Sequence, residues 1–281
     1  IVICPEATND KKAEIQSNEF IDSLRNASTT KDELAYLLFS NSIEKEDKAS
    51  SLAAFAKSNP MNKIALHEAL MNCVEEPNIG ACDVNWSQLI NDNDRDNGSL
   101  WANLASFYAK RGEQANSEMA MEEAAKSPLF NSYSFDIAKL YMDVTEAQID
   151  TPFYNRSSIA VGYFAAKTTH LGELVKLCSD HKTQSLSLKN TCLALGQNIE
   201  QNSNTLLDKA LGRAIQMKTY EAEANEEAVK KLKEKNDNLS FELGSDQGFD
   251  AMILSMFDEE LFHSWMNNAI EHGESKAAKM L

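Results

Sequence analysis

The chain has 281 residues, 43% of them apolar, and its 27 basic and 43 acidic side chains give a formal net charge of −16. An acidic surface repels phosphate backbones and anionic lipid, which disfavours nucleic-acid and membrane-surface roles. Ten glycines and five prolines are too few for the many tight turns of a β-rich fold, so the composition predicts an all-α protein. The sequence has no apolar run of about 18 residues, so no transmembrane helix is expected.

Apolar residues recur at spacings of three and four along most of the chain, which is the pattern of amphipathic helices. The predicted helices cover about residues 11–25, 30–43, 44–59, 60–76, 82–92, 99–112, 113–127, 132–148, 153–170, 170–181, 185–201, 205–237 and 249–273. Most are joined by two to six residues, which favours antiparallel neighbours stacked as hairpins. We divide the chain into an N-terminal helical cap (1–59), repeat-like hairpins (60–150) and further C-terminal hairpins (151–281).

Three local signals refine these helices. Thr30 with Glu33 has the spacing of a capping box, and Pro60 suits the first turn of the helix that follows it. The second half of 205–237 is nearly all charged or alanine, which predicts a solvated helix projecting past the core, with disorder as the competing interpretation. The helix over 249–273 is strongly apolar and closes the chain.

Residues 97–128 resemble one unit of the tetratricopeptide repeat family. The matching positions are Trp101, Leu104, Ala105, Tyr108, Gly112 and Ala124. Ser117 and Met121 depart from the family pattern, which has alanine and an aromatic residue there, and neighbouring units match less well. The resemblance implies a superhelix of stacked hairpins that holds peptides or protein surfaces in a concave groove. It would place Asn103, Tyr108 and Lys110 on that groove, with packing as the alternative role of Tyr108.

The stretch NDNDRDNG at 91–98 has aspartates at alternate positions, as calcium loops do. A calcium loop that starts at Asp92 needs glycine at its sixth residue and glutamate at its twelfth, and this chain has Asn97 and Asn103 there. We therefore interpret the stretch as a turn that opens a helix, with Asn97 or Ser99 as the N-cap.

Five cysteines occur, and four of them form two local pairs, Cys73 with Cys82 and Cys178 with Cys192. Each pair spans the end of one helix and part of the next, positions that an antiparallel hairpin can bring within disulfide distance. Two disulfides would indicate an oxidising compartment, the periplasm or the cell exterior. Reduced, buried thiols are the alternative, and Cys4 has no local partner. The paired layout also resembles that of exported bacterial helical-repeat proteins.

Metal and catalytic motifs are weak. Cys178 and Cys192 with His170 and His181 could form a zinc site, but their spacing matches no usual zinc finger. The sequence has no glycine-rich phosphate loop or nucleophile-elbow motif, so we expect no cofactor and no catalytic residue.

The sequence thus predicts a non-catalytic scaffold that binds a protein or peptide outside the cytoplasm. Two alternatives stay open. One is an enzyme built on a helical toroid, a hydrolase or lyase with an acid-lined cleft. The other is an acidic cytoplasmic regulator that binds a basic partner.

Overall fold

The computed structural model describes residues 10–26, 29–148, 151–166, 171–179, 185–237 and 253–281, and within these ranges the chain forms helices joined by turns and loops, with no β-strand. This confirms the all-α prediction. The helices are α1 (Asp10–Asn26), α2 (Thr30–Phe39), α3 (Lys45–Ser58), α4 (Lys63–Glu75), the 3₁₀ turn η1 (Gly80–Cys82), α5 (Trp86–Asn93), α6 (Gly98–Lys110), α7 (Gln114–Lys126), α8 (Ser134–Gln148), α9 (Phe153–Ala166), α10 (Gly172–Ser179), α11 (Leu186–Asn202), α12 (Leu206–Ala222), α13 (Glu226–Asp237), α16 (Glu259–His272) and α17 (Glu274–Ala278). None of them is long and apolar enough to cross a membrane.

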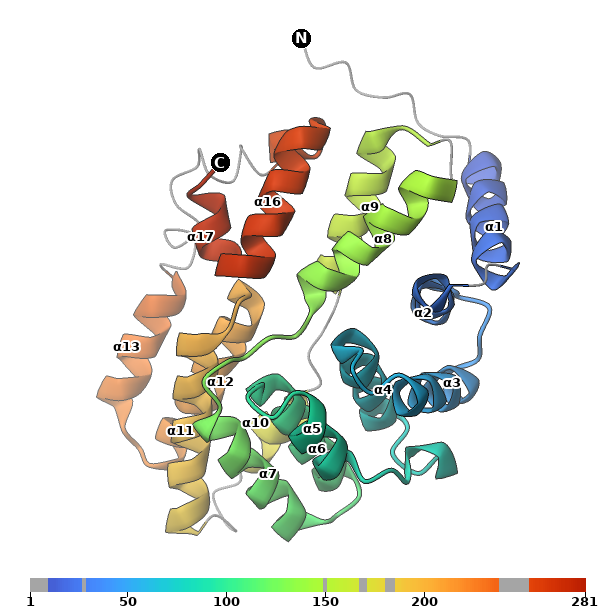
Figure 1. Ribbon diagram of the computed structural model, residues 1–281. Helices are drawn as coiled ribbons and strands as arrows, with labels where there is room; N and C mark the ends of the chain where they lie inside the picture. The colour runs from blue at the N-terminus through green and yellow to red at the C-terminus, as the bar shows by residue number, and fades with distance from the viewer. Residues whose placement is uncertain (1–9, 27–28, 149–150, 167–170, 180–184, 238–252) are drawn as a thin grey trace.

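Successive helices pair as hairpins, and helices from distant parts of the chain pack between the pairs (Figure 1). The pairs α3/α4, α6/α7, α8/α9, α11/α12 and α12/α13 pack directly. In addition, α7 contacts α11, α10 contacts both α6 and α12, and α16 contacts α8, while α1 and α2 from the N-terminal end also reach α8. One continuous hydrophobic core therefore runs through the molecule.

The hairpin α6/α7 forms as the sequence indicates. Asn97 is the N-cap of α6, and its side chain accepts a hydrogen bond from the Ser99 backbone N–H. Gly112 has a φ of +73° in the turn to α7, a conformation that suits glycine. Ser117, which stands where the repeat family has alanine, donates from Oγ to the Ala105 carbonyl oxygen at 2.8 Å. The departure at Ser117 thus adds a hydrogen bond between the two helices.

One predicted cap and one predicted helix start were misplaced. Helix α2 begins at Thr30 as expected, but Thr29, not Thr30, is its N-cap, and the Thr29 side chain accepts from the Asp32 backbone N–H. Helix α4 begins after Pro60, because Asn62 caps it by accepting from Ala65 N at 3.0 Å. In both places a side-chain oxygen that bonds the free N–H groups determines the start.

The long helix expected over 205–237 is in fact two helices, α12 and α13, that pack against each other. The break lies at Ala224, whose φ is 53°, and Asn225 then caps α13 by accepting from Ala228 N at 3.2 Å. Arg213 of α12 is buried, and it donates from Nη1 to the Lys235 carbonyl oxygen of α13 at 3.1 Å. The charged second half of this stretch therefore folds back on α12, and the prediction that it projects past the core was wrong.

The apolar closing helix expected over 249–273 corresponds to α16, which begins only at Glu259 because Asp258 caps it. Its buried face consists of Phe262, Trp265, Met266 and Ala269. Edge-to-face ring contacts from Trp265 to Phe135 and from Phe262 to Phe153 hold this face against α8 and α9. Gly273, with a φ of 83°, then turns the chain into the short helix α17.

Candidate functional site

Both predicted cysteine pairs are disulfides in the structure. Cys73 of α4 bonds to Cys82 of η1, with the Cα atoms 5.6 Å apart, and Cys178 of α10 bonds to Cys192 of α11, with the Cα atoms 5.8 Å apart. All four residues are fully buried. Each bond therefore joins two consecutive elements inside the core and not at the surface.

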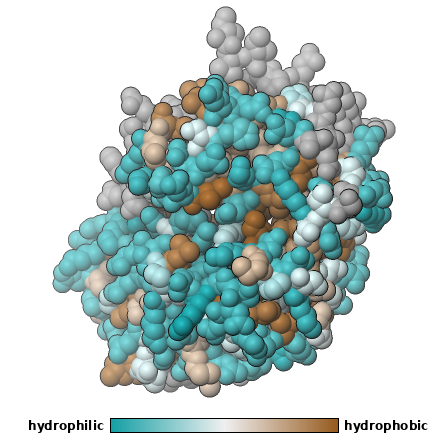
Figure 2. All heavy atoms as spheres, viewed as in Figure 1, coloured by the Kyte–Doolittle hydropathy of each residue, from teal (hydrophilic) through white to brown (hydrophobic). Residues whose placement is uncertain are grey.

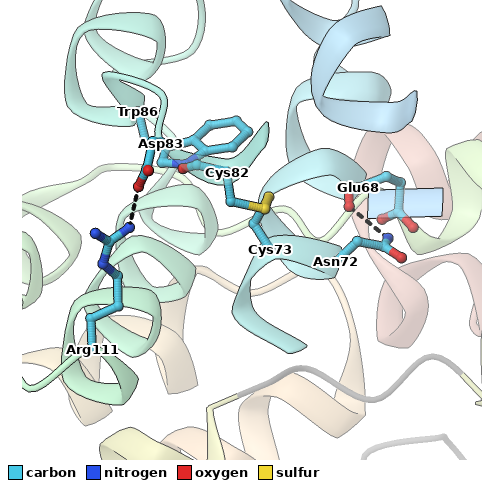
Figure 3. The surroundings of a disulfide bond; sticks show 7 residues. All are labelled: Glu68, Asn72, Cys73, Cys82, Asp83, Trp86 and Arg111. Atoms are coloured by element: carbon cyan, nitrogen blue, oxygen red, sulfur yellow. Dashed lines mark hydrogen bonds and ion pairs between the residues drawn. A yellow bond between two sulfur atoms is a disulfide. The ribbon is translucent and has the colours of Figure 1, made fainter. Parts of the chain in front are cut away.

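The surroundings of the first disulfide hold the turn after α4 in place (Figure 3). The Trp86 indole N–H donates to the Cys82 carbonyl oxygen at 3.1 Å, and Arg111 at the end of α6 pairs with Asp83 at 2.7 Å. The disulfide thus connects α4 with the α5–α6 region, where the repeat-like hairpin begins.

The zinc alternative does not agree with these bonds, because Cys178 and Cys192 are bonded to each other and provide no thiolates. Its other two residues, His170 and His181, lie outside the described residues, as does Cys4. Within the described part of the chain, no group of three or more His, Cys, Asp or Glu side chains could hold a metal ion.

The aspartate stretch is a helix-opening turn. Asp92 and Asp96 are exposed, whereas Asp94 is buried and bonded to protein side chains. Asp94 Oδ1 pairs with Lys63 Nζ at 2.7 Å, and Asp94 Oδ2 accepts from Asn97 Nδ2 at 2.9 Å and from the Tyr133 hydroxyl. The three aspartates therefore do not converge on one point, as the ligands of a calcium ion must.

The three residues expected on a partner groove lie in different environments. Asn103 is 1% exposed and lies in the interior, so it faces no groove. Tyr108 is half-buried and packs against the core, with its hydroxyl 3.4 Å from Ser87 Oγ. Lys110 is exposed at the end of α6. The structure does not bring these three side chains together as one surface.

The interior contains a group of buried polar side chains that we call the polar junction. Its members come from α4, the stretch from the end of α5 into α6, the α7–α8 connection and α12, and each is 8% exposed or less: His67, Glu68, Asp94, Asn97, Ser99, Asn103, Tyr133 and Asp208. In Figure 1 the α7–α8 connection passes α12 on its way to α8, and Phe130 in it exchanges backbone hydrogen bonds with Asn202 and Asn204. The junction thus lies where four segments meet.

Asn97 bonds two of these segments together. Its Oδ1 accepts from Asn131 N at 2.9 Å, and its Nδ2 donates to the Asn131 carbonyl oxygen at 3.0 Å. Tyr133 follows with a φ of 55°, a conformation that is uncommon for a residue with a side chain. Burial, with the hydrogen bond to Asp94, raises the pKa of the Tyr133 hydroxyl well above its ordinary value.

His67 is the centre of a hydrogen-bonded chain from hydroxyl to imidazole to carboxylate. His67 Nδ1 lies 3.0 Å from Glu68 Oε1, and His67 Nε2 lies 3.2 Å from Ser99 Oγ. Asn103 Nδ2, a donor, also lies 3.3 Å from Nε2, which assigns the proton to Nδ1 and leaves Nε2 as an acceptor. This order of groups is that of a serine nucleophile with its general base. However, His67 and Ser99 are at most 1% exposed, so no substrate reaches Ser99 Oγ in this conformation.

A surface groove lies between α2, the start of α4, and α8. Its volume is 340 Å³, and its lining combines apolar side chains with charged ones: Thr30, Lys31, Leu34, Asn62, Ile64, Asp136, Lys139, Leu140 and Asp143. On the face shown in Figure 2, apolar atoms gather near the middle of the molecule and hydrophilic atoms surround them. A second hollow, of 540 Å³, is formed by the end of α12, the turn that follows it and α13.

Sequence reasoning missed both the polar junction and the groove. Their residues are far apart in the chain, for example His67 and Ser99, or Lys31 and Asp143, so no local spacing indicates them. The one signal available was the unusual density of Ser and Asn around 127–134, in a connection whose Ser127, Ser132 and Ser134 side chains are buried.

No protein-family model, curated protein or solved structure matches this chain.

Proposed function

We propose that the chain is a non-catalytic binding protein that works outside the cytoplasm and holds an extended peptide of a partner protein in the groove between α2, α4 and α8. The observation that carries the proposal is the groove itself, because three helices from separate hairpins contribute to it. Concave sites with an apolar floor and a few polar groups are typical of ligand binding.

The lining has the chemistry that peptide binding requires. Leu34 and Leu140 are almost fully buried and form an apolar floor, to which the half-buried Ile64 adds. Asp143 on the rim pairs with Lys31 at 2.9 Å and lies 3.7 Å from Lys139. Both signs of charge are thus present at the rim, which favours a peptide with an apolar side chain for the floor and polar neighbours.

The location in an oxidising compartment is supported by the two disulfides, since such bonds persist in secreted and periplasmic proteins. Thiol titration of the unfolded, unreduced chain tests this part. One reactive thiol, that of Cys4, is expected from protein isolated without reductant, and four or five would favour the cytoplasmic alternative.

In this proposal the hairpins form a tetratricopeptide-like superhelix. The α6/α7 unit supports this arrangement, because Ala105 and Ala124 are fully buried and Gly112 forms the turn. The formal charge of −16 supports a protein or peptide partner over nucleic acid.

Selection from a library of displayed peptides tests the groove. We expect enriched peptides that lose about tenfold or more in affinity, roughly 1.4 kcal/mol, when Thr30→Arg fills the groove. The matched control is Gln114→Arg, since both residues are exposed first residues of helices and gain the same side chain. Equal losses for both variants, or no enriched peptide, would contradict the proposal.

A second candidate function, hydrolysis of an acyl substrate, is favoured by the Ser99–His67–Glu68 chain. It requires an opening of α4 from α6 that admits substrate to Ser99 Oγ. A fluorophosphonate probe, which labels activated serines, separates the two functions. Labelling that is lost in Ser99→Ala but kept in Ser106→Ala, another buried serine of α6, would favour the hydrolase. Absence of labelling in folded wild type would exclude it.

A further inference from the structure

Large apolar side chains are exposed close together in the stretch 253–261, which leads into α16 and forms its first residues. These side chains are Ile253, Leu254, Phe257 and Leu261, and they are between 39% and 54% exposed. We call these four residues the apolar patch. Single exposed apolar side chains are normal on a protein surface, whereas a cluster commonly marks a site of interaction.

The turn that carries the patch is fastened to α9. The Phe257 backbone N–H donates to the Leu254 carbonyl oxygen at 3.0 Å, which closes the turn. Ser157 of α9 donates from Oγ to the Met256 carbonyl oxygen at 2.7 Å, and the Phe257 ring stacks on the Tyr154 ring with the centroids 4.4 Å apart. The patch is therefore held in place before any partner arrives, which lowers the entropy cost of binding.

Three exposed carboxylates interrupt the patch: Asp258, Glu259 and Glu260. Glu259 lies 3.5 Å from Arg156 Nη2 and 3.9 Å from His263 Nε2, and the Arg156 side chain is only 12% exposed. Glu260 makes no ion pair within the described part of the chain. The surface around the apolar side chains therefore carries more negative than positive charge.

We propose that the apolar patch binds a basic, amphipathic segment of a partner protein. The apolar side chains of that segment cover the patch, and its Lys or Arg side chains pair with Asp258, Glu259 and Glu260. Complementary charge of this kind speeds association and fixes the orientation of the bound segment.

The charge of the surface argues against two other occupants. A second copy of this chain, paired through the same patch about a two-fold axis, would bring like-charged carboxylates together from both copies. Anionic lipid would be repelled for the same reason. The patch shares no residue with the groove between α2, α4 and α8, so this proposal and the peptide groove can fail independently.

Binding of a synthetic peptide to the full chain tests the patch. The probe is a fluorescein-labelled peptide of leucine and lysine at helical spacing, and its charge control has glutamate in place of each lysine. Fluorescence anisotropy should show saturable one-to-one binding of the lysine peptide alone, weaker at higher salt. No binding of the lysine peptide, or equal binding of both peptides, would overturn the proposal.

Two pairs of variants locate the binding. Glu260→Lys should weaken binding about fivefold or more, since an attraction becomes a repulsion. Glu271→Lys makes the same change of charge near the other end of α16 and should have little effect. Leu254→Ser should weaken binding about tenfold through the lost apolar contact, whereas Met119→Ser, an equally exposed position on α7, should not.

Two results would contradict the patch as the binding surface. Equal losses for Glu260→Lys and Glu271→Lys would show attraction to the acidic protein as a whole. Sedimentation of the chain alone distinguishes a second copy as the occupant: self-association that Leu254→Ser abolishes would overturn the proposal, and a monomer is expected.

Discussion

Gly196 of α11 and Gly212 of α12 meet at the crossing of their helices, where a Cβ on Gly196 would lie 2.7 Å from the Gly212 carbonyl oxygen. A Cβ on Gly212 would in turn lie 2.7 Å from the Gly196 oxygen. Beside the crossing, Glu200 accepts from Arg213 Nε at 3.1 Å and from Gln216 Nε2 at 2.8 Å. The two helices are thus packed backbone to backbone, with a buried polar cluster along their seam.

Gly196→Ala should destabilise the protein by about 1–3 kcal/mol, the usual cost of forcing an extra methyl group into a packed interface. The atom nearest to the new methyl group is the Gly212 backbone oxygen, which cannot rotate away as a side chain can. Gly162→Ala is the control, since that glycine lies within helix α9 with nothing within 4 Å, and it should gain about 0.5–1 kcal/mol from helix propensity. Urea unfolding of both variants measures the difference; equal effects would contradict the close crossing.

Removal of the second disulfide by Cys178→Ser with Cys192→Ser should lower the free energy of unfolding by about 2–4 kcal/mol, since the unfolded chain regains the freedom of the closed loop. Thermal unfolding followed by circular dichroism checks this. Wild type treated with reductant should be less stable than this double variant, because the Cys73–Cys82 bond then opens as well. A double variant as stable as wild type would show that the bond does not constrain the chain in solution.

Asn97→Ala should destabilise the protein by about 1–3 kcal/mol, because it removes the cap of α6 and leaves the partly buried backbone N–H and carbonyl of Asn131 without their partner. Asn91→Ala is a suitable control, since its exposed side chain makes only a local bond to the Ser87 carbonyl oxygen. The free energies of unfolding of the two variants, measured by chemical denaturation, should therefore differ clearly. Similar stabilities would mean that the polar junction contributes little.

Three of the seven tyrosines should resist alkaline titration. Burial raises the pKa of the Tyr133, Tyr141 and Tyr163 hydroxyls above the ordinary value of 10.0. Because the folded-state pKa is the higher one, the contribution to stability is complete below about pH 10 and is lost as the pH rises beyond it. Absorbance at about 295 nm should show these phenols ionising together with unfolding. Smooth titration of all seven in the folded protein would contradict their burial.

Much of the fold was predictable because its signals are local. Helix periodicity, the Asn97 cap, the glycine turn at Gly112 and the short spacing within each cysteine pair all act within a few residues. The break at Ala224 was missed because alanine rarely adopts a positive φ. Asn225 followed by two glutamates is a helix-start signal that could have placed α13.

The candidate sites could not be predicted in the same way. Asp94 and Tyr133 meet across 39 residues, and the groove brings α2 to α8, so both depend on how the hairpins pack. The environment of Asn103 also depends on how the hairpins pack. Its place on the repeat pattern indicated a groove, but α4 packs against α6 and covers it, so that its amide bonds His67.

Methyl NMR of the protein with a selected peptide tests the central claim most directly, that a partner binds between α2, α4 and α8. The account predicts that the largest shifts occur at the methyl groups of Leu34, Ile64 and Leu140, and that Met119, exposed on α7, stays unchanged. Shifts that cluster around Met119 or elsewhere, with the three groove residues unaffected, would contradict it.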